Sequence, residues 1–330
     1  MTKVSVLIAV YNTEKYLPEC LDSLLNQTLM EWEAICVDDA STDGSWNIMQ
    51  EYSAKDERIR VIRLSENHGQ AYARNQALAK AKGDYVAFLD SDDKLSRDAL
   101  EKVVACFQTH PLTDCVLFHL KYFSDTDVHH SEWDYPQPHY GILSGQEAFR
   151  LSLTWKIHGV YVVRAGIHRR YPYDDSSRWY SDDNTTRLHY YASRDVTECE
   201  GVYYYRQHSA SVSHVVDVHR FDYLSANASM REMLLELHSP KEVLDEYENC
   251  RWLIVIDMYM FYYKYRRELP AADRRMGLEK IKLAWKSIDI KAVSNRNRCK
   301  FGYWPLRFSW TLFRMQEEAY FSLRKLLGRL

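Results

Sequence analysis

The chain lacks the glycine-rich loops that bind phosphate groups in two large classes of protein. Neither GxxxxGK[ST], the P-loop pattern, nor GxGxxG, the dinucleotide-binding pattern, occurs in its 330 residues. The sequence therefore excludes both loops. If this protein binds a phosphorylated ligand, another arrangement of side chains must offset the negative charge of the phosphates.

Paired cysteines and long apolar runs are also missing. The seven cysteines are scattered, odd in number and without a CxxC pair, which is typical of free thiols in a reducing cytosol. A strand-like run begins almost at the first residue, with no room for a signal peptide. No segment approaches ~18 uncharged apolar residues, the length that a membrane-spanning helix needs. We therefore expect a cytoplasmic protein.

The charge balance argues against a nucleic-acid partner. The formal net charge is −3, with 46% hydrophobic and 27% charged residues, which is ordinary for a globular protein. A nucleic-acid-binding chain usually carries a basic surface, and no overall basic excess exists here. We expect no nucleic acid as a partner.

Apolar runs alternate with amphipathic segments over the first 95 residues. Continuous apolar runs predict buried strands at 4–10, 34–38, 60–64 and 85–89. Between the first two runs, apolar residues recur with helical spacing at positions 17, 20, 21, 24 and 25. We expect Asn12 or Thr13 to cap this helix. We expect Gly83 to follow the C-terminus of the helix before the fourth strand.

This alternation predicts an α/β fold with a doubly wound, mostly parallel sheet. In such sheets, ligands bind beyond the carboxyl ends of the strands. Polar or aromatic residues follow three of the four predicted strands: Tyr11-Asn12, Asp38-Asp39 and the acidic turn 90–93. We expect these residues to meet at one edge of the sheet and to form a binding site there.

The segment GDYVAFLDSDDKL ends an apolar run in three carboxylates, Asp90, Asp92 and Asp93. Carboxylates held close together repel each other unless a cation offsets their charge. Mg²⁺ and Mn²⁺ prefer oxygen ligands and commonly take one or two carboxylates together with substrate phosphates. The triplet alone is also compatible with a solvated loop at the start of the next helix, where acids are stabilising.

Several motifs together resemble a known family. VSVLIAVYNTEKYLPECLDSLLNQT, AICVDDASTDGS and ENHGQAYARNQALAKAKGDYVAFLDSDD follow in order, and WYSDDNTTRLHYYA and VYYYRQHSASVSH come later. This series resembles glycosyltransferase family 2, a family of inverting enzymes with the GT-A fold, over roughly residues 1–215. One departure is Val10, where the family usually has proline.

The resemblance implies a role for each matching residue toward a UDP-sugar donor. Tyr11 and Asn12 stand where the first loop of the family packs on the nucleoside. Asp39, which Asp38 precedes, stands where a carboxylate accepts a hydrogen bond from the uracil N3–H. Further residues stand at the ribose and diphosphate (Arg74, Asp90), at the donor sugar (Asp93, Asp182) and at the metal (Asp92, with Asp90). The implied cofactor is Mn²⁺ or Mg²⁺.

The acceptor side of the resemblance centres on one acid. Asp183 stands at the family's general base, which takes a proton from the acceptor hydroxyl. Asp182 stands where the family usually has glutamate, so its role is the less firmly implied of the two. The resemblance also offers His208 or His214 as a further metal ligand, and Arg206 as a contact of the diphosphate.

From these motifs we expect a catalytic domain over 1–220, with a nucleotide-binding half (1–110) and an acceptor-side half (111–220), followed by a helical region over 221–330. Segment 296–330 has eight Lys/Arg against two Glu, together with many aromatics. That composition suits either the surface of an anionic membrane or a helical cap packed on the protein. A membrane contact would place the protein at the inner face of the membrane.

The expected function is transfer of a sugar from a UDP-sugar to a saccharide or lipid-linked acceptor, in the synthesis of a cell-surface polysaccharide. One rival is a sugar-nucleotide-binding protein without turnover, and the intact Asp92 and Asp183 argue against it. A second rival is a nucleotidyltransferase, but AVYNTEKY lacks the glycine-rich, lysine-containing loop that such enzymes carry. The sequence does not specify the donor sugar, the acceptor or the oligomeric state.

Overall fold

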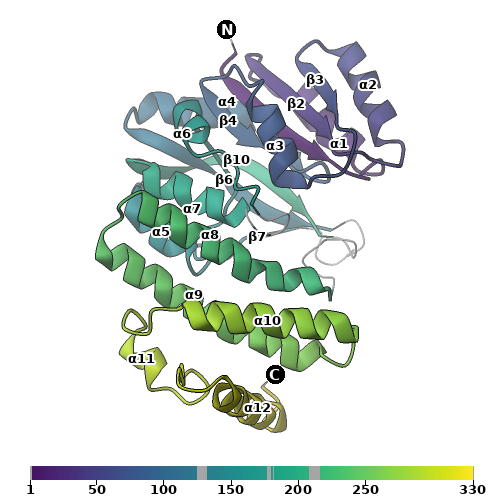
Figure 1. The fold of residues 1–330 in the computed structure, drawn as a ribbon. Helices are drawn as coiled ribbons and strands as arrows, with labels where there is room; N and C mark the ends of the chain where they lie inside the picture. The colour runs from purple at the N-terminus through teal and green to yellow at the C-terminus, as the bar shows by residue number, and fades with distance from the viewer. Residues whose placement is uncertain (1, 125–131, 177–179, 181, 208–215, 330) are drawn as a thin grey trace. The chain divides into compact units, whose positions relative to one another are not determined.

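We describe the protein from a computed structural model, which covers residues 2–124, 132–176, 180, 182–207 and 216–329. The chain divides into two compact units, Met1–Val212 and Ser213–Leu330 (Figure 1). The sequence placed this boundary near residue 220.

One mixed sheet forms the centre of the N-terminal unit. Its main path among the described residues runs β3-β2-β1-β4-β9-β6-β10-β5, with β7 paired to β6 and β8 to β10. The strands are β1 (Val4–Val10), β2 (Trp32–Asp38), β3 (Ile59–Arg63), β4 (Tyr85–Phe88), β5 (Lys94–Leu95), β6 (Thr113–Phe123), β7 (Glu132–Asp134), β8 (Leu143–Ser144), β9 (Tyr161–Arg164) and β10 (Asp195–Arg206).

The four strands predicted in the first 95 residues lie side by side and parallel. β1 pairs with β2 and β4, and β2 pairs with β3, all in parallel register. β9 is antiparallel to both β4 and β6, β10 is parallel to β6, and the edge strand β5 is antiparallel to β10. The predicted α/β fold with a doubly wound, mostly parallel sheet is confirmed.

Helices cover both faces of this sheet, because successive side chains of a buried strand point to opposite faces. Val6 and Ile8 of β1 pack in one cluster with α1 (Leu17–Leu25), α2 (Ser45–Lys55) and α4 (Ala99–Thr109). Leu7 packs on the other face, with α3 (Gln70–Leu78) and α6 (Ala165–Arg170). The remaining two helices, α5 (Gly145–Ser152) and α7 (Asp182–Ala192), contact each other (Figure 1).

Two predictions about helix ends were wrong. The N-cap of α1 is Tyr16, without a side-chain cap, and a proline in the first turn sets the start of the helix instead of Asn12 or Thr13. α3 ends at Leu78, so Gly83 is not its C′ residue. A Cβ on Gly83 would lie 2.7 Å from the backbone nitrogen of Ser5, and this close approach to β1 explains the glycine.

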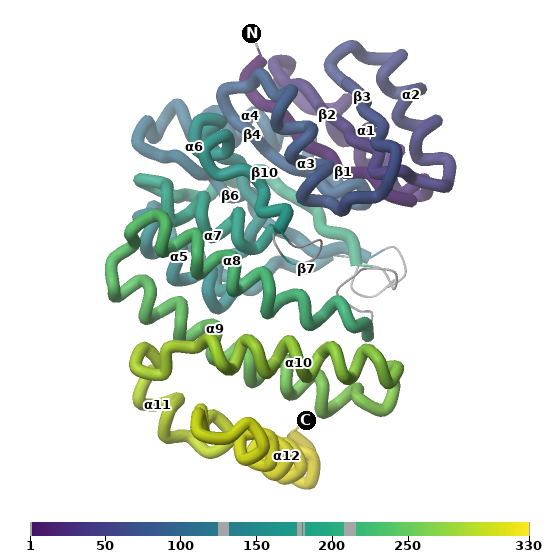
Figure 2. The backbone as a smooth tube through the Cα atoms, viewed as in Figure 1, coloured from purple at the N-terminus to yellow at the C-terminus, as the bar shows by residue number. Residues whose placement is uncertain are grey.

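The C-terminal unit is helical in its described part. It contains a 3₁₀ turn, η2 (Val218–Phe221), and the helices α8 (Asp222–Glu236), α9 (Lys241–Tyr265), α10 (Ala271–Ser287), α11 (Asn295–Arg298) and α12 (Trp310–Leu326). The long helix α9 packs against α8, α10 and α12 (Figure 2). Among the helices in the described parts of the chain, none has both the length and the apolar character to cross a bilayer.

Candidate active site

The carboxyl ends of three parallel strands bring the predicted residues to one edge of the sheet. Val10, the last residue of β1, stands opposite Asp38, and Leu7 stands opposite Phe88 of β4. The residues that follow these strands therefore lie along the same edge, as the sequence predicted. These residues are Tyr11 and Asn12, Asp39, and the acidic turn 90–93.

The loop after β1 is fixed to the loop after β2. Asn12 has a φ of 52°, in the left-handed region that asparagine tolerates better than most residues. Its side-chain oxygen accepts a hydrogen bond of 2.8 Å from the backbone N–H of Thr42, and its own N–H donates to the Ser41 hydroxyl. Tyr11 is 47% exposed, so its ring faces solvent at the edge of the sheet.

The two acids at the end of β2, Asp38 and Asp39, are buried and already hydrogen-bonded. Asp39 accepts hydrogen bonds of 2.8 Å from the backbone N–H groups of His68 and Gly69, one on each carboxylate oxygen. Asp38 accepts from the N–H of Ser41 and lies 3.2 Å from the Nε of Arg63. Asp39 therefore orders the loop that begins α3, and Asp38 ties β2 to β3.

A hollow of about 520 Å³ lies beside these acids, at the ends of β2 and β3. Ala40, Ser41, Arg63, Leu64 and Ser65 line it. Since Arg63 also pairs with Asp38, the hollow adjoins the predicted nucleotide-binding residues.

Asp90 is held by a buried cation. The Arg74 guanidinium donates to its carboxylate, and the side-chain amide of Gln70 donates to the same oxygen over 2.8 Å. Burial acts to lower the pKa of Arg74, but the charge of Asp90 raises it, so Arg74 stays charged. Burial raises the pKa of Asp90, and the nearby charges of Asp92 and Asp182 act in the same direction against the effect of Arg74.

Asp93 points into the protein instead of toward a ligand. It is 2% exposed, its Oδ2 accepts from the Tyr203 hydroxyl, and its Oδ1 accepts from the backbone N–H of Arg206. Burial, followed by the charges of Asp90 and Asp92, raises the pKa of Asp93 well above its ordinary value. The resemblance implied a contact with the donor sugar, whereas this geometry gives Asp93 the role of holding the acidic turn.

Arg206 also supports this turn from inside. It is 3% exposed; its Nε donates to the backbone carbonyl of Asp92 over 2.8 Å, and its guanidinium pairs with Glu19. Lys94 lies 2.6 Å from the same Glu19 carboxylate. Arg206 thus holds the acidic turn through these contacts, and its contact with the diphosphate stays a prediction.

The acids of the acceptor side lie at the start of α7. Asp182 and Asp183 occupy its first turn, where the helix dipole favours negative charge. Asp182 is close enough to act on the pKa of both Asp90 and Arg74, so α7 begins next to the acidic turn. Asp183 lies 3.9 Å from the fully buried guanidinium of Arg187, one helical turn later.

A divalent cation fits this arrangement only with help from a substrate. Among the residues of the chain that the structure describes, no group of three or more His, Cys, Asp or Glu side chains could hold a metal by itself. The acids nevertheless crowd together: burial raises the pKa of Asp90 and Asp93, and the charges of the neighbouring acids act in the same direction. Asp90 and Asp92 are only partly buried, whereas Asp93 is buried, so Asp90 and Asp92 are the acids of this turn that keep exposed surface. His208 and His214 lie outside the described residues.

Some supporting residues had no signal in the sequence. Tyr203 is one of three consecutive tyrosines on β10. Side chains alternate between the two faces of a strand, and only this alternation turns Tyr203 toward Asp93. Gln70 and Glu19 are polar residues on helices, with nothing in the local pattern to distinguish them from solvent-facing positions. These residues become part of the site through the fold alone.

Comparison with known proteins identifies the family. A family model described as glycosyl transferase family 2 matches residues 5–173. The chain belongs to this family. The predicted resemblance is thereby confirmed.

The curated relatives share mainly the N-terminal part. A Bacillus subtilis glycosyltransferase named for teichuronic acid biosynthesis, TuaG, is 54% identical over 99 residues, which is 30% of this chain and 39% of TuaG. A poly(ribitol-phosphate) beta-glucosyltransferase of Bacillus spizizenii is 48% identical over 101 residues, 30% of this chain and 16% of that protein. The matches thus span well under half of either relative.

A solved structure covers nearly the whole chain. Residues 1–349 of S. aureus TarS, crystallised in complex with UDP-GlcNAc, match with a TM-score of 0.76 and 20% identity over 97% of this chain and 92% of that one. At this level of identity the likeness concerns the fold, and it confirms the GT-A fold predicted from the sequence.

Proposed function

We propose that this protein is a metal-dependent, inverting glycosyltransferase that moves a sugar from a UDP-sugar to an acceptor hydroxyl. The observation that carries the proposal is the position of α7. Its first turn brings Asp182 within electrostatic reach of Asp90, although about half of the N-terminal unit separates them in sequence. The turn that carries the candidate base, Asp183, therefore begins close to the candidate diphosphate site.

The donor would lie along the edge of the sheet. Tyr11 offers an exposed ring for the nucleoside, and the hollow beside Asp39 and Arg63 would receive the base or ribose. Each carboxylate oxygen of Asp39 has a second lone pair for a base N–H. The UDP-GlcNAc bound by the TarS structure, which has the same fold, supports a uridine donor.

The reaction follows from the charges that develop. Bound at Asp92 and Asp90, Mg²⁺ or Mn²⁺ would neutralise the diphosphate as it leaves the anomeric carbon. Asp183 would accept the proton of the acceptor hydroxyl while that oxygen attacks from the opposite face. One displacement of this kind inverts the configuration, and it needs only one base. Arg187 would keep Asp183 charged and oriented.

The cellular role we propose is synthesis of a cell-surface polysaccharide, since the relatives' names refer to teichuronic acid and poly(ribitol phosphate). The distinguishing experiment is UDP release from UDP-Glc, UDP-Gal, UDP-GlcNAc, UDP-GalNAc and UDP-GlcA, each with Mn²⁺. Release from one of these donors supports a transferase. Binding without release would favour a non-catalytic sugar-nucleotide-binding protein, and formation of a UDP-sugar from UTP would favour a nucleotidyltransferase.

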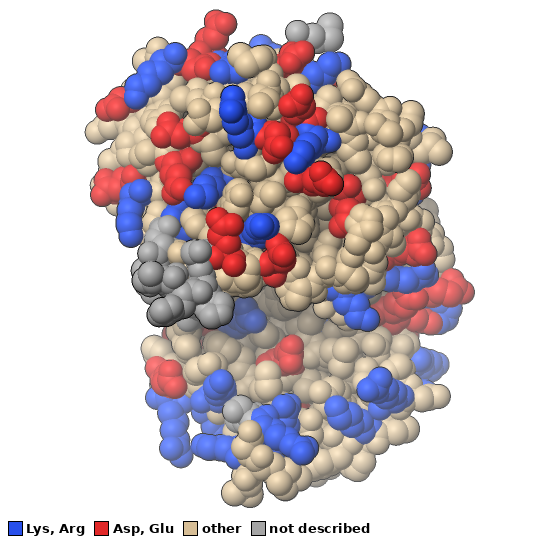
Figure 3. Space-filling view, turned by 180° about the vertical axis from the view of Figure 1, so that it is seen from behind, with Lys and Arg blue, Asp and Glu red and all other residues tan. Residues whose placement is uncertain are grey.

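We further propose that the C-terminal unit touches an anionic membrane surface. Helix α12 buries Phe313 and Phe321 against its own unit, and its other side exposes Leu312, Met315 and Leu323. Of the two glutamates of segment 296–330, Glu317 is buried and the partly exposed Glu318 pairs with Arg266. The segment therefore carries an excess of basic charge, with eight Lys/Arg against two Glu. In the lower part of the view in Figure 3, Lys and Arg side chains outnumber Asp and Glu.

A further inference from the structure

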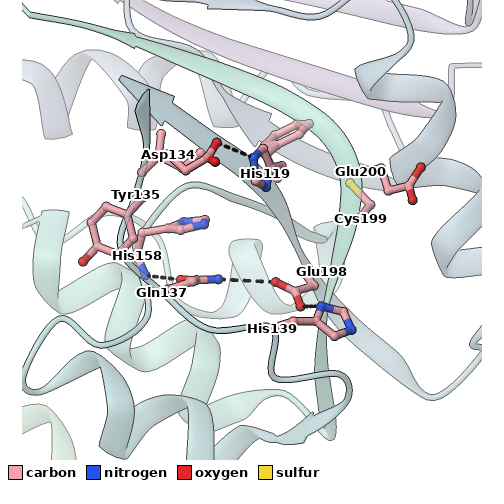
Figure 4. A pocket seen from close by; sticks show the side chains of 11 residues that line it. His119, Asp134, Tyr135, Gln137, His139, His158, Glu198, Cys199 and Glu200 are labelled. Carbon is pink, nitrogen blue, oxygen red and sulfur yellow. Dashed lines mark hydrogen bonds and ion pairs between the residues drawn. The ribbon is translucent and has the colours of Figure 1, made fainter. Parts of the chain in front are cut away.

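A cavity of about 640 Å³, lined by both polar and apolar side chains, lies in the acceptor-side half of the N-terminal unit. Its walls are β6 around His119, segment 134–139, and β10 around Glu198, where the register of β10 against β6 shifts (Figure 4). We propose that this cavity binds an uncharged, hydroxyl-rich saccharide, as the part of the acceptor that precedes the reacting hydroxyl. The link to the acceptor rests on the function proposed above.

The cavity is lined with paired donors and acceptors. The Nε2 of His119 lies 2.9 Å from the Oδ1 of Asp134, and His139 pairs with Glu198. Gln137 donates to the same Glu198 over 3.4 Å and accepts from the backbone N–H of His158 over 3.3 Å. Sugar hydroxyls both donate and accept hydrogen bonds, so they match such pairs on either side.

These pairs are not needed to hold the fold together. The side chain of His139 is 81% exposed and that of His119 is 47% exposed. Ion pairs this open to solvent contribute little to folding stability. Because these pairs line a cavity and add little to stability, binding of a ligand explains their position better than a structural role does.

The charge of the cavity selects against anionic ligands. Asp134, Glu198 and Glu200 line it, and no lysine or arginine is among the lining residues that the structure describes. Two lysines approach from outside the lining: the Nζ of Lys121 lies 3.9 Å from Asp134, and that of Lys102 lies 4.0 Å from the Glu200 carboxylate. A phosphate or carboxylate group would be repelled by this excess of acid. The segment bound here is therefore uncharged, even if the complete acceptor carries phosphate elsewhere.

Direct contacts join the cavity wall to the catalytic helix. The Tyr135 hydroxyl donates to the backbone carbonyl of Trp155 over 2.6 Å, and the Trp155 ring lies 5.3 Å from the Arg187 guanidinium. Arg187 in turn approaches Asp183. Tyr190, also on α7, donates to the carbonyl of His158, which lines the cavity. A saccharide in the cavity would thus be positioned from the same elements that position the base.

The test is binding of labelled full-length protein to a glycan array. The array carries neutral β-linked hexose and N-acetylhexosamine oligomers beside oligomers that bear phosphodiesters or uronic acids. We expect binding to neutral oligomers. His139→Ala and Glu198→Gln should each weaken it about tenfold, the effect of one lost hydrogen bond to a charged group. His110→Ala, which removes an exposed histidine outside the cavity, is the matched control.

The affinity for UDP with Mn²⁺, measured by calorimetry on the same proteins, separates the two proposals. It should be unchanged in both variants, which also shows that they fold. Undiminished glycan binding by the variants, a preference for the anionic oligomers, or no glycan binding at all would each overturn the saccharide site. If the protein binds neutral oligomers through His139 and Glu198 but has no affinity for UDP, the saccharide site stands. The proposed UDP-sugar donor is then refuted instead.

Discussion

The Tyr203 hydroxyl donates a hydrogen bond of 2.8 Å to the carboxylate of Asp93, across 110 residues of sequence. The same hydroxyl accepts from the backbone N–H of Asp90 over 3.0 Å. One side chain of β10 thus holds both ends of the acidic turn that follows β4. The turn is therefore shaped from the acceptor-side half of the unit as well as from the nucleotide-binding half.

Tyr203→Phe should destabilise the N-terminal unit by about 1–3 kcal/mol. The substitution removes one donor from a buried carboxylate and one acceptor from a buried N–H, and unsatisfied buried groups cost energy of this order. Urea unfolding of both proteins measures the change. Tyr204→Phe, at the neighbouring and less buried position, should shift the midpoint much less. Equal effects at the two positions would contradict this role of Tyr203.

Asp92→Asn should abolish the metal-dependent part of UDP binding. A neutral amide is a poorer ligand than a carboxylate for a hard cation. Calorimetry of UDP with Mn²⁺, and again with EDTA, should show a large difference for the wild type and little for the variant. Asp84→Asn, which removes an exposed acid just before the start of β4, at the other end of that strand from the turn, should behave as the wild type does. An unchanged affinity in Asp92→Asn would mean that Asp92 is not a ligand.

Glu317→Gln should stabilise the C-terminal unit at high pH. Burial raises the pKa of Glu317 from 4.5 to about 8. Because the folded-state pKa is the higher one, the protonated acid favours folding below about pH 4.5, and this contribution is lost as the pH rises toward 8. The difference in the free energy of unfolding between Glu317→Gln and the wild type should therefore grow by up to ~1.4 kcal/mol per pH unit between pH 4.5 and 8. Above pH 8 this difference should level off.

Urea unfolding at pH 5 and pH 8 checks this expectation. Glu279→Gln on α10, where the residue is exposed, is the control and should show no such growth. A gain for Glu317→Gln that is the same at both pH values would contradict the burial of an ionisable carboxyl.

The membrane proposal predicts flotation with anionic liposomes. Each basic residue near such a surface contributes about 1 kcal/mol, and the attraction is screened over about 8 Å at physiological salt. The protein should float at low salt and less at high salt. Leu323→Glu with Leu326→Glu, both exposed on α12, should abolish flotation, while Met276→Glu with Leu283→Glu on α10 should not. Flotation that changes neither with the salt concentration nor with either double substitution would contradict the proposal.

The sequence predicted the fold where local patterns repeat. Continuous apolar runs marked β1 to β4, because strands buried on both faces have few polar positions. The acids after these strands were also visible, since they interrupt apolar runs. The antiparallel β9 was not predicted, because strand direction depends on a long connection and leaves no periodic signal in a short strand.

The sequence predicted where in the fold the candidate site lies, but not which side chains contact each other there. Asp90 and Asp92 share one turn with Asp93, yet only the structure shows that Tyr203 and Arg206 turn Asp93 inward. Burial of this kind depends on residues distant in sequence. The cavity at His119 was missed for the same reason, as its lining comes from four separate segments.

The measurement that tests the central claim most directly is the turnover of Asp183→Asn with the donor found in the UDP-release screen. If Asp183 is the general base, transfer should fall by roughly 10²–10⁴-fold, while the calorimetric affinity for UDP with Mn²⁺ stays at the wild-type value. Asp175→Asn, which replaces another acid in the segment before α7, should retain near wild-type transfer. Transfer by Asp183→Asn at close to the wild-type rate would contradict the account, because the base would then lie elsewhere.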